Sequence, residues 1–102
     1  MKIVGPRTLL LHPAARFGWR DALRGRPFEY DFRLPDLDPS ECSMAYELVR
    51  QLAGVAVKEG VDPGFYPEGE PSKALVALVR RELEWGSDER TGNLEGVTRR
   101  AA

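Results

Sequence analysis

Residues 28–60 read FEYDFRLPDLDPSECSMAYELVRQLAGVAVKEG, and they decide the fold that the sequence predicts. At the start of this stretch apolar and charged side chains alternate, and a period of two places each kind on one face of an extended chain. The apolar side chains are Phe28, Tyr30, Phe32 and Leu34, and the charged ones are Glu29, Asp31 and Arg33. We therefore predict a half-buried β-strand over residues 28–34, which Pro35 ends.

A long helix is predicted directly after this strand. Asp38 can accept from the first free backbone N–H groups, Pro39 suits the first helical position, and Glu41 completes a capping box. An apolar stripe with helical spacing follows, formed by Met44, Ala45, Leu48, Val49, Leu52, Val55 and Ala56. The predicted helix covers residues 39–59 and ends before a glycine. The alternative is a helix that ends at Gly54 and is followed by a short strand.

Two strands and a short helix are predicted before this stretch. Residues 2–4 and 8–11 are read as strands because they flank a Gly-Pro-Arg turn. Pro13 opens a helix that stops at Gly25. The apolar face of this helix is formed by Ala15, Trp19, Ala22 and Leu23. Gly18 within the helix costs about 1 kcal/mol relative to alanine, so a broken helix or a structured loop is the alternative.

The remaining chain is predicted to form a loop, a helix and a tail. Turn-forming residues dominate residues 61–70. A second long helix then starts at Pro71 and ends at Gly86. Its apolar face is formed by Leu75, Leu78, Val79 and Leu83. Residues 87–102 lose the apolar periodicity and are predicted to be a polar tail.

Together these elements predict an α+β fold, with one domain over residues 1–86 and the tail over residues 87–102. Two long helices would cover one face of a small antiparallel sheet of two or three strands. Such a small sheet has exposed edges, and exposed edges favour pairing with another chain. The predicted fold class therefore favours self-association or a protein partner.

Length and composition exclude several classes of protein. A chain of 102 residues has room for one domain. One cysteine and one histidine exclude an intrachain disulfide and a Cys/His zinc cage within one chain. No signal-peptide pattern is visible, and the longest aliphatic run is far shorter than a membrane span. We expect a soluble, cytoplasmic protein that makes no membrane contact.

The sequence offers no combination of residues typical of an active site. His12 has no triad motif around it and is interpreted as a residue at a strand-to-helix junction. Cys42 falls in the first turn of a predicted helix, where the dipole lowers a thiol pKa, but a buried helix residue is the simpler interpretation. Asp36, Asp38 and Glu41 form an acidic cluster that can bind a divalent ion, but the pattern of a calcium loop is absent and helix capping already explains Asp38 and Glu41. An enzyme acting through these three acids is the weakest hypothesis. We predict no catalytic residue, no metal and no cofactor.

Charge is unevenly distributed along a chain whose formal net charge is −1. Residues 7–33 carry six arginines and three acids, whereas residues 59–70 carry four acids and no base. Such an asymmetry can steer a partner, or it can help copies of the chain to meet head to tail.

The basic part of the chain supports an alternative function, the binding of nucleic acid. Arginines interleave with aromatic residues over residues 16–33, and single-strand binders combine arginine for phosphates with aromatic rings for bases. The residues assigned to this alternative are Arg16, Trp19, Arg20, Arg24 and Arg26. The slightly acidic chain as a whole, and the need for the strand's aromatic residues in the core, argue against it.

The function that we expect is that of a non-enzymatic protein-interaction module. Aromatic residues stand among turn formers and acids in the loop around Phe65, and exposed aromatic residues are typical hot spots of protein interfaces. The predicted interface residues are Phe65, Tyr66, Glu68, Glu70 and Trp85; in the alternative interpretation, Phe65 or Tyr66 folds back as a lid over the helices. We expect a small assembly subunit, adaptor or inhibitor, such as a phage-type accessory protein, whose partner is another protein or a further copy of itself.

Overall fold

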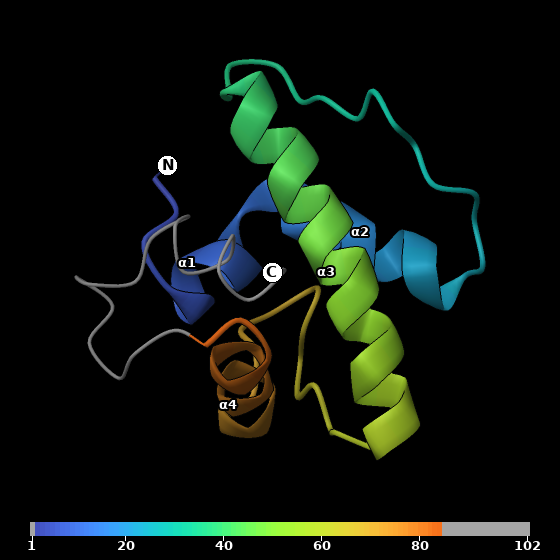
Figure 1. Ribbon diagram of the computed structural model, residues 1–102, viewed down its shortest axis with the longest axis vertical. Coiled ribbons are helices and arrows are strands. Elements are labelled where there is room, and N and C mark those ends of the chain that lie inside the picture. Colours follow the sequence, from blue (N-terminus) through green and yellow to red (C-terminus); the bar gives the residue numbers. More distant parts are fainter. Residues whose placement is uncertain (1, 85–102) are drawn as a thin grey trace.

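The computed structural model describes residues 2–84, which form four α-helices and two longer loops (Figure 1). The helices are α1 (Pro6–Leu11), α2 (Pro13–Leu23), α3 (Pro39–Glu59) and α4 (Lys73–Glu82). The α2–α3 loop covers residues 24–38, and the α3–α4 loop covers residues 60–72. Residues 2–84 contain no strand, and their β-pairing is limited to one bridge between Gly64 and Pro71. The predicted α+β fold is therefore wrong, and the described chain is helical.

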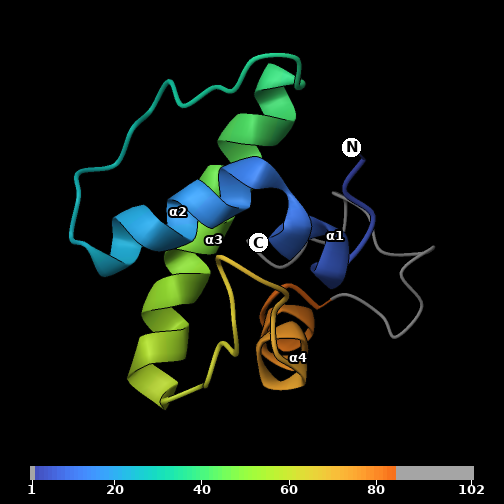
Figure 2. The ribbon, with the colours of Figure 1, turned by 180° about the vertical axis from the view of Figure 1, so that it is seen from behind.

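Helix α3 is the central element, and α2 crosses it at close range (Figures 1 and 2). Gly18 of α2 lies against the carbonyl group of Tyr46 on α3, and a Cβ atom at position 18 would overlap that carbonyl oxygen. The glycine that weakens an isolated helix is thus the residue that lets two helix backbones approach each other. Helices α1 and α4 contact each other and α3 on one side of this crossing.

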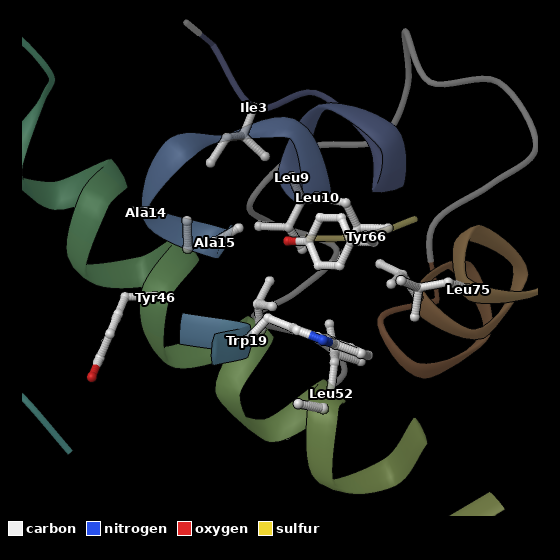
Figure 3. Close-up of a cluster of buried hydrophobic side chains, with 14 of the residues drawn as sticks. Ile3, Leu9, Leu10, Ala14, Ala15, Trp19, Tyr46, Leu52, Tyr66 and Leu75 are labelled. Carbon is white, nitrogen blue, oxygen red and sulfur yellow. The ribbon is translucent and has the colours of Figure 1, made fainter. Parts of the chain in front are cut away.

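Side chains from all four helices and from the α3–α4 loop meet in one hydrophobic core (Figure 3). Trp19 of α2 lies edge-on to Tyr66 of the α3–α4 loop, with ring centroids 5.3 Å apart. Helix α1 contributes Leu9 and Leu10, and α4 contributes Leu75, all fully buried. Because a loop residue takes part in this packing, the α3–α4 loop belongs to the core structure.

Residues 28–34 are not a strand, which corrects the prediction drawn from their alternating pattern. The backbone N–H of Phe32 donates to the carbonyl of Glu29, so a tight turn interrupts the extended chain. This turn leaves Phe32 buried and Tyr30 81% exposed, although a period of two would place both on one face. A strand also needs a neighbour to pair its backbone groups, and residues 2–84 supply none. Aromatic packing on α3 fixes this segment instead.

Residues 8–11 are helical, so the two N-terminal strands predicted for residues 2–4 and 8–11 are also wrong. The hydroxyl oxygen of Thr8 accepts from the backbone N–H groups of Val4 and Gly5, both at 2.9 Å. These bonds close the first turn of α1, and Pro6 stands at the first helical position. The capping bonds of Thr8 therefore favour a helix, although the aliphatic run of residues 8–11 is typical of a strand.

The prediction for α3 is confirmed at both ends. The side chain of Asp38 accepts from the backbone N–H of Glu41 at 3.0 Å, and Gly60 has the left-handed backbone that ends a helix, with φ of 70°. The helix passes Gly54 without interruption, which rules out the alternative with a short strand after it.

Helix α2 is also confirmed, whereas α4 differs from its prediction. Helix α2 is continuous through Gly18 and is followed by Gly25, with φ of 66°. Helix α4 begins at Lys73 rather than Pro71, because the Ser72 hydroxyl caps it by accepting from a backbone N–H and Pro71 pairs with Gly64. It ends at Glu82, before the predicted end at Gly86. Gly86 itself and the predicted polar tail, residues 87–102, lie outside the described residues. None of the helices in residues 2–84 is long and apolar enough to span a membrane.

Candidate interaction surfaces

The α3–α4 loop has a backbone that is closed on itself. The bridge between Gly64 and Pro71 joins its two sides, and the backbone N–H of Ser72 donates to the carbonyl of Pro63 at 3.0 Å. The Ser72 hydroxyl donates to the carbonyl of Asp62 at 2.5 Å. Because the loop is already ordered by its own hydrogen bonds, the binding of a partner would cost little conformational entropy.

Arg16 of α2 attaches this loop to the helices. Its guanidinium donates to the carbonyl oxygens of Pro67 and Gly69, the latter at 3.1 Å, and its Cζ lies 5.6 Å from the centre of the Tyr66 ring. Tyr66 itself is 3% exposed, and burial raises the pKa of its phenol. Of the two adjacent aromatic residues in the loop, Tyr66 is therefore part of the core and anchors the loop.

Phe65 points the other way and is 83% exposed, the largest value among the exposed hydrophobic side chains of residues 2–84. A Cβ atom at Gly69 would lie only 2.8 Å from the Cβ of Phe65, so a glycine is needed beside it. The loop therefore holds an apolar ring in water on a closed and anchored backbone.

The acids of the loop pair with the arginines of the N-terminal helices. Glu68 lies 3.4 Å from Arg20 of α2, and Glu70 lies 3.4 Å from Arg7 of α1. The side chains of Glu68 and Glu70 are 74% and 76% exposed, so these ion pairs contribute little to stability, and the acids can pair with other charges instead. The charge asymmetry seen along the sequence is thus partly neutralised within the fold.

A second surface is built by the α2–α3 loop on α3. The ring of Phe32 stacks on Tyr46 at 4.3 Å with an angle of 10° between the planes, and Phe28 meets Tyr46 edge-on at 5.6 Å. The Tyr46 hydroxyl donates to Asp21 at 2.7 Å, and burial together with this carboxylate raises the pKa of the phenol. Arg50 donates to the carbonyl of Arg26 at 2.7 Å, which ties α3 to the loop.

An open hollow of about 450 Å³ lies where this loop runs beside α3. Its lining residues are Phe28, Tyr30, Glu47, Arg50 and Gln51. Phe28 is half-buried and Tyr30 is exposed, so one wall of the hollow is aromatic. The guanidinium of Arg50 lies over the Phe28 ring, with its Cζ 5.7 Å from the ring centre, and it donates hydrogen bonds to the Tyr46 hydroxyl and the Arg26 carbonyl. Of the two charged residues that line the hollow, only Glu47 therefore lacks a partner in residues 2–84.

Comparison with other proteins identifies no family. No family model, curated protein or solved structure matches this chain. The assignment of function therefore depends on the two surfaces themselves.

The residues predicted for nucleic-acid binding are not brought together on one open face. Trp19 is 2% exposed, while Arg16 and Arg20 are engaged with the α3–α4 loop. Arg24 and Arg26 are exposed at the end of α2, and no side-chain partner for them occurs in residues 2–84. Among the predicted interface residues, Trp85 lies outside the described residues.

His12 caps α2 and lies between two helices, rather than at the predicted junction of a strand and a helix. Its Nδ1 accepts from the backbone N–H of Ala14 at 3.1 Å, its side chain is fully buried, and burial lowers its pKa. Its Nε2 has no hydrogen-bond partner within residues 2–84 and lies 3.9 Å from a carboxylate oxygen of Glu41. Cys42 is buried, and no group of three or more potential metal ligands occurs in residues 2–84.

Sequence reasoning missed the hollow beside α3. Phe28 and Tyr30 were assigned to a strand, so nothing related them to Glu47, Arg50 and Gln51. The available signal was the spacing of the last three residues, which places them on one face of the helix. Because this face carries no apolar stripe, the sequence predicts an ordinary solvent-exposed helix surface there. Only the structure shows that the α2–α3 loop runs beside it.

Proposed function

We propose that this protein is a non-enzymatic protein-interaction module that binds through the α3–α4 loop, with Phe65 at the centre of the interface. The observation that supports the proposal is the exposed ring of Phe65 on a loop held by Tyr66, by Arg16 and by its own backbone bonds. Exposed aromatic residues on a preorganised backbone are the side chains that contribute most to binding at protein interfaces.

The surroundings of Phe65 also suit a protein partner. Glu68 and Glu70 are mostly exposed beside it and form the polar rim that typically surrounds an apolar anchor. An assembly subunit, an adaptor and an inhibitor all bind in this way, so the proposal covers these three roles.

Nucleic-acid binding is less well supported. Of the five residues assigned to it, the buried Trp19 has no open ring face on which a base could stack. Arg24 and Arg26 alone provide few phosphate contacts on a chain with a net charge of −1. We expect no salt-dependent binding to single-stranded oligonucleotides.

Photo-crosslinking in the native cell tests the proposed function. A photoreactive phenylalanine analogue replaces Phe65 in the full chain, and the same analogue at Val57, which is 64% exposed on α3, is the matched control. We expect discrete protein adducts from position 65 that are absent from position 57. Identical adduct patterns at the two positions, or no adduct at position 65, would contradict the proposal.

A further inference from the structure

We propose that His12 is a proton-sensitive switch: protonation of its ring opens the first turn of α2 and loosens the α3–α4 loop that carries Phe65. The effect on binding rests on the proposed function, because it requires this loop to be the interaction surface. The coupling between His12 and the loop is a property of the chain alone and is tested without a partner.

His12 is the single residue between α1 and α2, and it bonds to both helices. Its backbone N–H donates to the carbonyl of Leu9, and its own carbonyl accepts from the backbone N–H groups of Ala15 and Arg16. The side chain is fully buried, and its Nδ1 accepts from the backbone N–H of Ala14 at 3.1 Å. The imidazole ring is therefore part of the junction between the two helices.

The bond to Ala14 and a second proton compete for the same atom of the ring. In a neutral imidazole one nitrogen carries the hydrogen and the other accepts, so acceptance at Nδ1 places the hydrogen on Nε2. The lone pair that can take up a further proton is then the one that caps α2. A protonated His12 cannot accept from Ala14, and it places a positive charge at the start of a helix, where the helix dipole disfavours it.

The surroundings of the ring provide one opposite charge. Nε2 has no hydrogen-bond partner in residues 2–84, and it lies 3.9 Å from a carboxylate oxygen of Glu41 on α3. Arg7 of α1 and Arg16 of α2 donate to the α3–α4 loop instead of facing an acid near the ring. Burial lowers the pKa of His12, the carboxylate of Glu41 raises it, and the positive charge of the chain's amino group lowers it. Protonation in the capping position is therefore disfavoured, and the charged ring leaves the cap.

Arg16 transmits this change to the α3–α4 loop. It lies one turn after His12 on α2, and its guanidinium donates to the carbonyl oxygens of Pro67 and Gly69. When the first turn of α2 opens, these bonds lose their fixed donor, and the backbone beneath Phe65 is no longer attached to the helix. The backbone bonds within the loop do not involve α2, so the loop loosens without unfolding.

Proton linkage determines the direction and the size of the effect. The closed form holds a ring whose pKa is lowered, whereas the opened ring returns towards its ordinary value of 6.5, so the open form binds the proton more readily. The ratio of open to closed molecules therefore rises as the pH falls below 6.5, by at most about tenfold per pH unit. The chain contains one histidine, so any imidazole titration belongs to His12.

The experiment is a titration of the full-length protein from about pH 7.5 to about pH 5, above the range in which most carboxylates titrate, followed by nuclear magnetic resonance. The ring signals of His12 give its midpoint, and the backbone amides of residues 14–16 and 64–69 should shift with the same midpoint. The order parameters of residues 64–69 should fall from about 0.85, typical of rigid backbone, towards about 0.6. Residues 48–56 of α3 should keep their signals and order parameters.

Three variants identify the groups involved. His12→Asn keeps a capping oxygen but takes up no proton in this range, so the loop signals should stop responding to pH. Glu41→Gln removes the attraction for the charged ring and should move the midpoint to lower pH, which tests the proposal even if His12→Asn does not fold. Glu47→Gln, at an exposed position of the same helix, is the matched control and should leave the midpoint unchanged.

Four outcomes would overturn the inference. The His12 ring stays neutral down to about pH 5, or it titrates while residues 64–69 keep their signals and order parameters. The loop still responds to pH in His12→Asn, or residues 48–56 respond equally, which is global unfolding. Because the titration contains no partner, these outcomes are independent of the crosslinks from position 65 that test the proposed function.

Discussion

The two longer loops are held in place by different kinds of interaction. In the α2–α3 loop, the rings of Phe28 and Phe32 lie on Tyr46, and the described loop makes one backbone hydrogen bond of its own at the turn carrying Tyr30. In the α3–α4 loop, the backbone is bonded to itself and to Arg16, and one ring, that of Tyr66, enters the core.

The difference shows two ways to position an exposed aromatic residue. Tyr30 stays outside because its neighbours Phe28 and Phe32 are fixed by ring packing, which is insensitive to salt and pH. Phe65 stays outside because the backbone beneath it is fixed by hydrogen bonds to carbonyl groups. Substitutions that remove rings and substitutions that remove hydrogen bonds should therefore separate the two loops.

Phe32→Ala should have the largest effect, because it removes the ring stacked on Tyr46. We expect the free energy of unfolding to fall by about 3 kcal/mol, measured by urea denaturation. Tyr30→Ala is the matched control in the same loop and should change it by less than about 1 kcal/mol, since Tyr30 is mostly exposed. Equal losses from the two variants would contradict the packing described for this loop.

Gly18→Ala should weaken the packing of both longer loops, because both pack against α2. A Cβ atom at this position overlaps the Tyr46 carbonyl, so α2 must move away from α3, at a cost of about 2 to 3 kcal/mol. Gly54→Ala, in the exposed part of α3 with open space around it, should instead add about 0.5 to 1 kcal/mol. Thermal unfolding of the two variants checks the opposite signs.

Arg16→Gln should loosen only the α3–α4 loop. It removes two charged hydrogen bonds to carbonyl oxygens, and we expect a loss of about 2 kcal/mol in the free energy of unfolding. Arg20→Gln, which breaks a mostly exposed ion pair with Glu68, should cost less than about 1 kcal/mol. Amide hydrogen exchange should increase at residues 64–69 and stay unchanged at residues 28–34; an increase in both segments would argue against separate anchoring.

Removing one hydroxyl at a time compares the two anchoring tyrosines. Tyr46→Phe loses the bond to Asp21 and should cost about 1 kcal/mol. Tyr66→Phe removes a buried hydroxyl that has no partner in the described structure, so it should be neutral or stabilising by up to about 1 kcal/mol. Denaturation midpoints of the two variants measure this, and a larger loss from Tyr66→Phe would reveal a bond at that hydroxyl.

The last prediction concerns pH and the stability of α2, against which both loops pack. Burial lowers the pKa of His12 below its ordinary value of 6.5, so the unfolded chain binds the proton more readily than the folded one. The free energy of unfolding should therefore decrease as the pH falls below 6.5, by at most about 1.4 kcal/mol per pH unit from one group. His12→Asn keeps a capping side chain and should flatten this dependence in denaturation series at different pH.

The helices were predictable where local signals agreed. Asp38, Pro39 and Gly60 mark the two ends of α3, and capping depends on residues that are neighbours in sequence. The loop conformation of residues 28–34 could not be predicted, because apolar and charged side chains do alternate there and the turn at Tyr30 has no strong local signal. Whether an alternating segment becomes a strand depends on a partner strand, and that is a property of the whole chain.

The candidate site was predictable in part. The exposed aromatic loop follows from turn residues around Phe65, but nothing local distinguishes the outward Phe65 from the inward Tyr66. Their opposite orientations depend on Trp19 and Arg16, which lie about fifty residues away in the sequence.

The sequence by itself determined the extents of α2 and α3 and the absence of an intrachain disulfide, because these follow from spacing, capping and residue counts. Only the tertiary structure decided that the arginines of α1 and α2 meet the acids near residue 70, that Gly18 is a contact point and that a hollow opens beside α3. These features join residues that are distant along the chain, and burial and charge pairing act through space.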